Sequence, residues 1–296
     1  MLKARMATIA FVLKRSKPNA LRLARDLFPW LKRQGVRIIV PEGASPVPQG
    51  ATVVPLKELR HEADFVVVLG GDGTFLSAAH LVGDSGLPLL GINLGSLGFL
   101  TVFTVREARE ALEAALRGRL PVEERMRLRV KILSDGKVRA ERCAVNDAVL
   151  SQGALARLIE LEAFTGETRI TTYRADGLIV STPTGSTAYT LAAGGPILRP
   201  DLEAMVVTPI CPFTLADRPL VVPGNTKLRI TPGKRARNVV LTVDGQWGEH
   251  VEPGDSVLME RARKPLRLYL SEKTNFYEIL RTKLHWSREP RGNGGA

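Results

Sequence analysis

The first residues that could do chemistry form the run GGDGT at positions 70–74. An apolar, strand-like segment at residues 65–69 leads directly into it, and a helical pattern follows. Glycines let backbone amides approach an anion closely, and a helix N-terminus adds a partial positive charge, so such a turn is typical of a phosphate site. We therefore expect a phosphate loop made of Gly70, Gly71, Gly73 and Thr74.

Asp72 is the unusual member of this turn, because a carboxylate beside a phosphate repels it unless a metal ion or a proton transfer is involved. It could accept a hydroxyl proton or bind Mg²⁺; alternatively, it caps the helix while the glycines serve packing. The segment GINLGSLGFL at residues 91–100 follows the next strand. We expect its open backbone and Asn93 to lie beside the first turn at the carboxyl edge of a sheet, although Asn93 could be only a turn residue.

A second concentration of polar groups lies at residues 176–192, where Asp176 precedes an apolar strand and STPTGSTAY follows. The hydroxyls and amides at residues 185–187 suit a ribose or the edge of a base, and Tyr189 offers a flat aromatic face. For any single Ser or Thr, helix capping is the alternative. Asn146 and Asp147 place an amide beside a carboxylate, which suits paired ribose hydroxyls or an amide, and equally a simple turn.

The elements that must position these groups change character near residue 122. Residues 1–122 alternate apolar runs with helical patterns, which predicts a parallel α/β domain with flanking helices. Residues 123–270 show period-2 alternation, including Leu266, Leu268 and Leu270, which predicts a β-rich, sandwich-like second domain. Residues 271–296 read as a helix and tail that we expect to pack back on the first domain.

Composition narrows the class of protein. The 296 residues carry 42 Lys and Arg against 30 Asp and Glu, a net charge of +12, which favours anionic partners. Nucleic acid is not expected, since the basic residues are scattered and aromatic residues make up only 5%. No apolar run is long enough for a membrane helix, and Cys143 and Cys211 form no disulfide framework, so we expect a cytoplasmic protein.

Five segments in this order, GGDGTFL, GINLGSLGFL, VNDAVL, RADGLIVSTPTGSTAYTLAAGGPIL and VDGQ, closely resemble the bacterial NAD kinase family, which uses ATP or polyphosphate. The resemblance runs from about residue 65 to residue 246 and includes residues 275–286. STPTGSTAY is highly specific, whereas lipid kinases and phosphofructokinases share GGDGT. The resemblance implies an α/β domain, a β-rich domain and a dinucleotide held in the cleft between the two.

The resemblance also assigns roles to residues. It implies Asp72 as proton acceptor, Gly73 beside the nucleotide, Asn146 and Asp147 as an NAD-binding pair, and Arg174 and Asp176 as nicotinamide-side contacts. Its adenosine-binding segment matches Thr187, Ala188, Tyr189, Thr190, Leu191 and Ala192, and a late NAD contact matches Gln246. Arg157 and Phe213 stand where relatives carry histidine, which puts the role of Arg157 as an NAD contact in question. The family forms homodimers or homotetramers in which neighbouring subunits complete parts of the site.

The resulting hypothesis is transfer of the ATP γ-phosphoryl group to the 2′-hydroxyl of the adenosine ribose of NAD, with Asp72 as base. Mg²⁺, or Mn²⁺, would arrive with ATP, because the sequence shows no cage of carboxylates, and we assign no metal ligand in the chain. A lipid kinase and a dinucleotide-sensing module without catalysis are the alternatives. The sequence leaves open polyphosphate as donor and NADH as acceptor.

Overall fold

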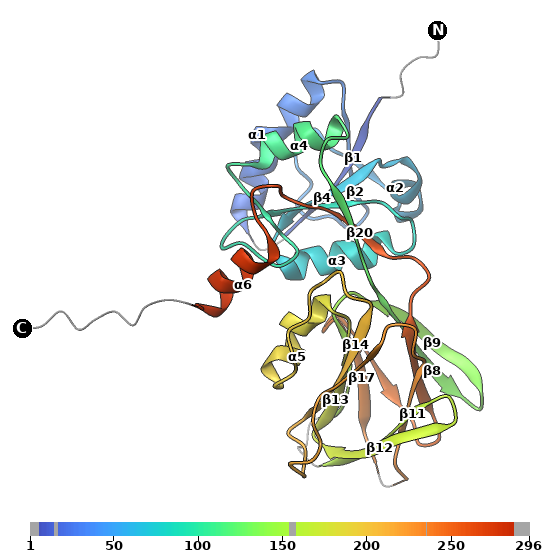
Figure 1. Ribbon diagram of the computed structural model, residues 1–296. Coiled ribbons are helices and arrows are strands. Elements are labelled where there is room, and N and C mark those ends of the chain that lie inside the picture. The colour runs from blue at the N-terminus through green and yellow to red at the C-terminus, as the bar shows by residue number, and fades with distance from the viewer. Residues whose placement is uncertain (1–5, 15–16, 154–157, 235, 287–296) are drawn as a thin grey trace, which may run out of the picture. The chain divides into compact units, whose positions relative to one another are not determined.

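The structure is a computed structural model that describes residues 6–14, 17–153, 158–234 and 236–286. The chain divides into two compact units, residues 1–123 with 267–296, and residues 124–266. Figure 1 traces the chain through both. Arg157, one of the expected site residues, lies outside the described residues.

The first unit is built on a mostly parallel sheet. Its strands are β1 (Thr8–Leu13), β2 (Arg37–Pro41), β3 (Thr52–Val54), β4 (Phe65–Gly70), β5 (Leu89–Asn93), β6 (Phe103–Thr104), β7 (Val122–Arg125) and β20 (Leu266–Tyr269). They follow the order β3-β2-β1-β4-β5-β20-β7, with β6 pairing β5. β4 is buried along its whole length, which fits its continuous apolar sequence and its parallel neighbours β1 and β5.

Helices connect these strands. They are α1 (Pro18–Arg33), α2 (Leu56–Glu62), α3 (Asp72–Val82), α4 (Ala108–Leu116) and the C-terminal α6 (Phe276–Leu284). α1 buries one apolar face that includes Leu27, Phe28 and Leu31. The chain leaves β1 toward β2 on one side and reaches β4 on the other, so the strand order reverses between β1 and β4. Ligands of open α/β sheets bind at the carboxyl ends of the strands beside such a reversal.

β20 differs from the expectation. The alternation of Leu266, Leu268 and Leu270 suggested a strand of the second domain, but Leu268 pairs in parallel with Leu89 of β5. Residues 267–296 accordingly belong to the first unit. Alternation signals one buried face and carries no information on which sheet supplies the neighbour. In α6, Asn275 and Glu278 form a capping box, and Ile279 belongs to the core of the first unit.

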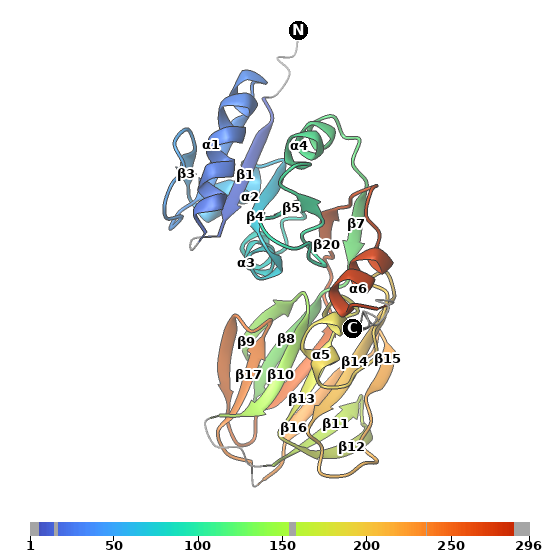
Figure 2. The same cartoon turned by 90° about the vertical axis from the view of Figure 1, so that its left-hand side faces the viewer.

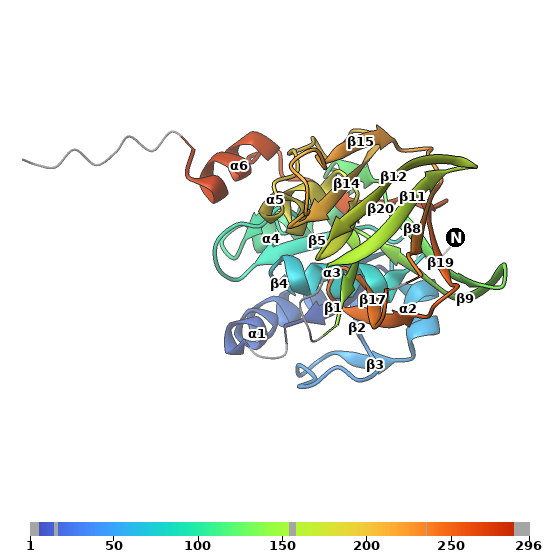
Figure 3. The ribbon, with the colours of Figure 1, turned by 90° about the horizontal axis from the view of Figure 1, so that it is seen from below.

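The second unit packs two antiparallel six-stranded sheets over one core. One sheet has the order β15-β14-β13-β10-β17-β18 and the other β12-β11-β16-β19-β8-β9. Their bounds are β8 (Leu128–Ser134), β9 (Lys137–Ala144), β10 (Asp147–Gln152), β11 (Ile159–Thr165), β12 (Thr168–Ala175), β13 (Gly177–Ser181), β14 (Ala204–Ile210), β15 (Leu220–Pro223), β16 (Leu228–Pro232), β17 (Val239–Val243), β18 (Trp247–Val251) and β19 (Ser256–Arg261). Figure 2 shows strands of both sheets, and Figure 3 shows β11 beside β12. A β-rich second unit is therefore confirmed.

In the first of these sheets, β13 and β10 direct alternate side chains toward the other sheet. Leu178 and Val180 of β13 and Ala148 and Leu150 of β10 point into the shared core. Asp147, Val149, Ile179 and Ser181 therefore share the opposite, outer face, because side chains alternate along a strand. In the described part of the chain, no helix is long and apolar enough to span a bilayer.

Candidate functional site

The carboxylate of Asp72 holds a distant loop. Asp72 is the first residue of α3, with Gly71 as N-cap, and its side chain does not cap that helix. Instead, Oδ2 accepts the amide of Phe99 at 2.9 Å, and Oδ1 accepts the amides of Leu100 and Thr101 at 3.1 Å each and the Thr101 hydroxyl at 3.0 Å. All four neighbours donate, so the carboxylate accepts every one of these hydrogen bonds.

The glycines around Asp72 allow this close approach. A Cβ on Gly98 would overlap Asp72 Oδ1 and lie 2.5 Å from Thr101 Oγ1. A Cβ on Gly91 would lie 2.8 Å from the Leu100 carbonyl oxygen, and one on Gly70 would overlap Thr74 Oγ1. Gly98 therefore allows the second glycine-rich segment to approach Asp72, whereas Gly70 and Gly91 make room for atoms close by in their own segments.

This corrects the expectation that residues 91–100 offer open backbone to a ligand. The amides of Phe99 and Leu100 bind Asp72, the Gly98 amide donates to the Thr101 carbonyl at 3.2 Å, and the Gly95 amide donates to Asn93 Oδ1 at 2.7 Å. Asn93, expected as a ligand contact or a turn residue, lies at the end of β5, is 7% exposed, and faces Thr101. The amides of Gly95, Gly98, Phe99 and Leu100 are thus occupied by partners within the chain.

A cavity of about 470 Å³ opens at the carboxyl ends of β1 and β2. It is lined by the ends of these strands, by residues 41–46 and by Gly73, Thr74 and Ser77 of α3. Lys14 lines it from the end of β1 and is exposed. One side of this cavity is the first turn of a helix, where amide groups concentrate, and Glu42 is the single carboxylate among the described residues that line it. An anionic ligand fits this environment.

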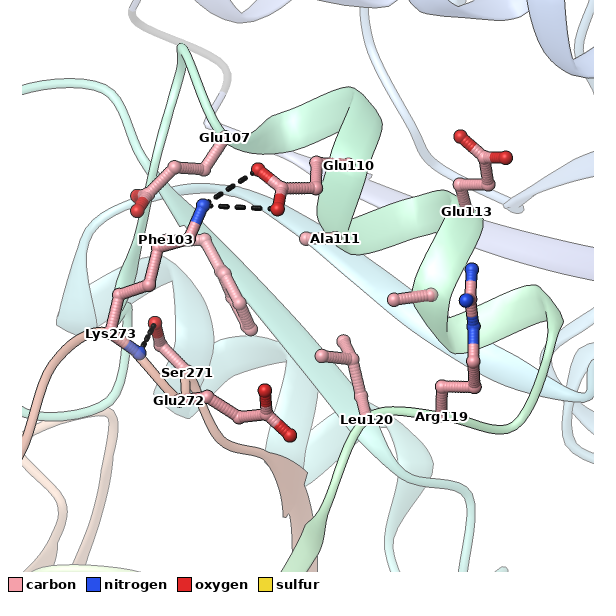
Figure 4. A pocket seen from close by; sticks show the side chains of 11 residues that line it. Phe103, Glu107, Glu110, Ala111, Glu113, Arg119, Leu120, Ser271, Glu272 and Lys273 are labelled. Carbon is pink, nitrogen blue, oxygen red and sulfur yellow. Dashed lines mark hydrogen bonds and ion pairs between the residues drawn. The ribbon is translucent and has the colours of Figure 1, made fainter.

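A larger cavity of about 530 Å³ lies beside α4 and contains none of the expected site residues. Figure 4 shows it with Glu107, Glu110, Glu113 and Glu272 around it. Lys273 Nζ contacts both carboxylate oxygens of Glu110, at 3.0 and 2.8 Å. Four carboxylates against Arg119 and an already paired lysine repel phosphates, so this cavity does not suit ATP or a dinucleotide.

In the second unit, Asp244 organises the residues before β10. Its carboxylate accepts the amide of Val145 at 2.8 Å, that of Asn146 at 2.7 Å and that of Asp147 at 3.0 Å. Asp244 also has a positive φ of 50° at the turn between β17 and β18, as its Asp-Gly dipeptide predicts. The sequence indicated only this turn. Asn146 lies between β9 and β10, and Asp147 opens β10.

Asp147 is a buried carboxyl group. It is 5% exposed, and burial together with the negative charge of Asp244 raises the pKa of Asp147 to about 7. Ser181 lies directly opposite it on β13 and is fully buried, and the Ser181 hydroxyl has no hydrogen-bond partner among the described residues. Near neutral pH this carboxyl can therefore donate or accept a hydrogen bond.

The STPTGSTAY segment folds back onto Asn146. The Thr182 amide donates to the Asn146 carbonyl at 2.8 Å, the Thr182 hydroxyl donates to the Val145 carbonyl at 2.6 Å, and a Cβ on Gly185 would overlap the Asn146 carbonyl oxygen. The segment then forms a 3₁₀ turn, Thr184–Thr187, followed by α5 (Tyr189–Ala192). Thr187, Ala188 and Leu191 are partly exposed, Tyr189 is 47% exposed, Ala192 is exposed and Thr190 is buried.

The remaining expected contacts lie at both ends of β13. Gln246 is exposed in the turn that Asp244 opens, near Asp147. Arg174 and Asp176 lie just before the first residue of β13. Asp147 pairs instead with Ser181, the last residue of β13. The five residues of β13 span roughly 17 Å. Arg174 stacks on Phe213, 4.8 Å from the ring centroid, and Arg174 Nε lies 3.6 Å from Glu160 Oε1. The structure thus brings Asn146, Asp147 and residues 182–187 together and leaves Arg174 and Asp176 apart.

Comparisons with known proteins decide the family. The family description "ATP-NAD kinase N-terminal domain" matches residues 9–120, and "ATP-NAD kinase C-terminal domain" matches residues 145–271. The chain belongs to the NAD kinase family. It is 44% identical to the NAD kinase of Geotalea daltonii over 281 residues, which is 95% of this chain and 99% of the relative.

Two solved kinase structures share the fold. A yeast NADH kinase crystallised with NADH superposes with a TM-score of 0.89 at 27% identity, over 98% of this chain and 90% of that one. An Archaeoglobus fulgidus NAD kinase crystallised with ATP gives a TM-score of 0.73 at 26% identity, over 93% and 99%. The activity that goes with this family is the ATP-dependent phosphorylation of NAD, EC 2.7.1.23. The lipid kinase and the non-catalytic sensor are thereby set aside.

Two residues of this site carried too little sequence signal to be singled out. Thr101 stands alone after the second glycine-rich segment, and its contact to Asp72 crosses 29 positions of sequence. Asp244 was visible as an Asp-Gly hairpin turn, and the same dipeptide at Asp135-Gly136 forms an ordinary turn between β8 and β9. A glycine without an evident turn, such as Gly98, is the one local sign that a side chain from elsewhere must fit there.

Proposed function

We propose that the chain transfers the γ-phosphoryl group of ATP to the 2′-hydroxyl of the adenosine ribose of NAD, giving NADP and ADP, with Asp72 as general base. The 2′-oxygen forms a bond to the γ-phosphorus, the bond from that phosphorus to the β–γ bridging oxygen breaks, and the hydroxyl proton passes to Asp72. The observation that carries the proposal is the arrangement around Asp72, whose Oδ2 accepts only one protein hydrogen bond among those of the described residues.

The donor site that best fits ATP is the cavity of about 470 Å³ at the ends of β1 and β2. The first turn of α3, with Gly73 and Thr74, faces the polyphosphate, and Lys14 adds a positive charge. Mg²⁺, or Mn²⁺, fits as a companion of ATP held by phosphate oxygens and water. In the described part of the chain, no group of three or more His, Cys, Asp or Glu could hold it. When bound, it neutralises the charge of the polyphosphate.

NAD binds the second unit in this proposal. Asn146 and Asp147 present an amide and a carboxyl group of variable protonation, which suit paired ribose hydroxyls or an amide of the nucleotide. Tyr189, with its exposed ring, and the neighbouring residues of α5 suit the adenosine. Cys143 and Cys211 are free thiols, in keeping with a reducing, cytoplasmic compartment.

We further propose a homodimer or homotetramer in which Arg174 and Asp176 serve the site of a neighbouring copy. These residues lie at the far end of β13 from Asp147, roughly 17 Å away, so one nucleotide bound at Asn146 and Asp147 does not readily reach them. Phe213 beside Arg174 is 66% exposed and Leu215 is 85% exposed, an apolar surface that a second copy can bury.

The function is tested by incubating the full chain with NAD or NADH against ATP or polyphosphate, and detecting NADP or NADPH with a coupled dehydrogenase. We expect NADP from NAD with ATP and Mg²⁺. Absence of any phosphorylated dinucleotide, with NAD binding retained, contradicts the proposed reaction. The same four combinations decide whether polyphosphate replaces ATP and whether NADH is accepted.

A shared site predicts complementation between two inactive variants. Asp72→Asn and Asp176→Ala chains, each inactive alone, are co-expressed with different tags and purified through both. If Asp176 acts in the neighbour's site, the dimers that carry both tags regain about half of the wild-type activity, because each of them has one intact site in two. No recovery in a verified mixed oligomer, or a monomer by sedimentation, contradicts the shared site.

A further inference from the structure

A chain of hydrogen bonds ends on the proposed base. Asn93 Nδ2 donates to Thr101 Oγ1 at 2.7 Å, and Thr101 Oγ1 donates to Asp72 Oδ1 at 3.0 Å. Thr101 is fully buried and Asn93 is 7% exposed. All three residues lie in the first unit, at the ends of β4 and β5 and in the loop that follows β5.

The donor and the acceptor of each hydrogen bond in this series are fixed. Asn93 Oδ1 accepts the Gly95 amide at 2.7 Å, and a backbone amide can bond only to the oxygen of that side chain. The Asn93 nitrogen must therefore face Thr101, and the Thr101 oxygen must accept from it. The single proton of the Thr101 hydroxyl is left for Asp72.

This polarity makes the two oxygens of Asp72 unequal. Oδ1 accepts three hydrogen bonds, from the Leu100 amide, the Thr101 amide and the Thr101 hydroxyl, whereas Oδ2 accepts one, from the Phe99 amide. Each carboxylate oxygen has about two lone-pair positions. Oδ1 is therefore saturated, and Oδ2 keeps a position for one more proton.

We propose that Thr101, oriented by Asn93, is a positioning residue for the phosphoryl transfer: it saturates Oδ1 and fixes the carboxylate so that Oδ2 takes the proton of the acceptor hydroxyl. This inference rests on the proposed role of Asp72 as base. Gly98 is part of the same arrangement, because a Cβ there would overlap Asp72 Oδ1 and crowd Thr101 Oγ1.

Two substitutions at Thr101 separate this role from packing. Thr101→Val keeps the shape and the backbone amide but removes the hydroxyl, and Thr101→Ser keeps the hydroxyl. A hydrogen bond to a charged group contributes about 1.5–3 kcal/mol, so Thr101→Val is expected to lower kcat about tenfold or more. We expect the KM for NAD to change less than about threefold, since binding contacts are untouched, and Thr101→Ser to restore kcat to within about threefold of wild type. Thr8→Val is the matched control. It makes the same change at a buried position, at the amino end of β1.

A double variant links the effect to Asp72. If Thr101 acts through the carboxylate, adding Thr101→Val to Asp72→Asn lowers the residual rate no further. Thermal melts and NAD titrations on each protein confirm that it is folded and binds. Thr101→Val with wild-type kcat, or Thr101→Ser as slow as Thr101→Val, overturns the positioning role while leaving the kinase assignment intact. An active Asp72→Asn enzyme instead overturns the proposed base.

Discussion

Asp72→Asn is expected to lower kcat for NAD phosphorylation by about a thousandfold, in the range that general-base catalysis contributes. The structure makes asparagine an informative substitution here. Its oxygen can keep the position of Oδ1 with the Leu100 and Thr101 donors, while its amide nitrogen replaces Oδ2. The loop at residues 99–101 then retains three of the four hydrogen bonds that the Asp72 carboxylate accepts, and only the oxygen proposed as base is lost.

The readouts follow from that geometry. The dissociation constant for NAD, measured by calorimetry, should stay within about tenfold of wild type, because the Phe99 amide loses its acceptor and nothing else is displaced. Asp72→Ala removes all four hydrogen bonds and should also lower the melting temperature. Asp26→Asn, an exposed carboxylate on α1, is the control and should leave kcat unchanged. A wild-type kcat for Asp72→Asn contradicts the role of Asp72 as base.

The turn at Asp72 also illustrates how far sequence reasoning reached. The junction of a buried strand, two glycines and a helix was predictable, because β4 and α3 follow from local apolar patterns. The partners of the carboxylate were not, since they lie 27 to 29 residues further on, and no local pattern records a contact across that distance. The glycine-rich run at residues 91–100 therefore looked like a ligand surface, although its Phe99 and Leu100 amides bind Asp72.

The placement of residues 266–270 in the wrong domain has the same cause, a contact between residues far apart in the sequence. Their alternation correctly predicts a strand with one buried face, and β20 is that strand. Membership of a sheet depends on which neighbours the chain topology brings alongside, and the preceding strands of the second unit made that unit the obvious host. The return of β20 to β5 is a long-range pairing that period-2 alternation cannot encode.

Asp147 gives the largest expected effect on stability. Burial and the charge of Asp244 raise the pKa of Asp147 from 3.8 to about 7 in the folded chain. Between these two values the folded protein holds a proton that the unfolded chain releases, so the free energy of unfolding falls as pH rises through this window. The loss is complete above pH 7 and amounts to about 4 kcal/mol at most.

Asp147→Asn carries no charge and escapes this loss. We therefore expect the variant to be more stable than wild type at pH 8, by up to about 4 kcal/mol, and the difference to shrink toward pH 4, where both side chains are neutral. Trp247 lies on β18 of the second unit, so its fluorescence in a Trp30→Phe, Trp286→Phe background follows that unit during urea denaturation at each pH. Glu141→Gln, at an exposed position on β9, should show no such pH-dependent gain.

The same substitution separates the structural and the binding roles of this carboxyl group. Asparagine resembles the protonated acid in shape and in having both a donor and an acceptor, so NAD affinity at pH 6 should be nearly retained. At pH 8 the carboxyl group of Asp147 in the wild type is an acceptor only. If NAD affinity at pH 8 falls in Asp147→Asn but not in the wild type, the ionised form of Asp147 is the one that binds the ribose hydroxyls. If the stability of Asp147→Asn tracks that of wild type at every pH, Asp147 does not titrate near neutrality, and burial beside Asp244 does not govern this end of β10.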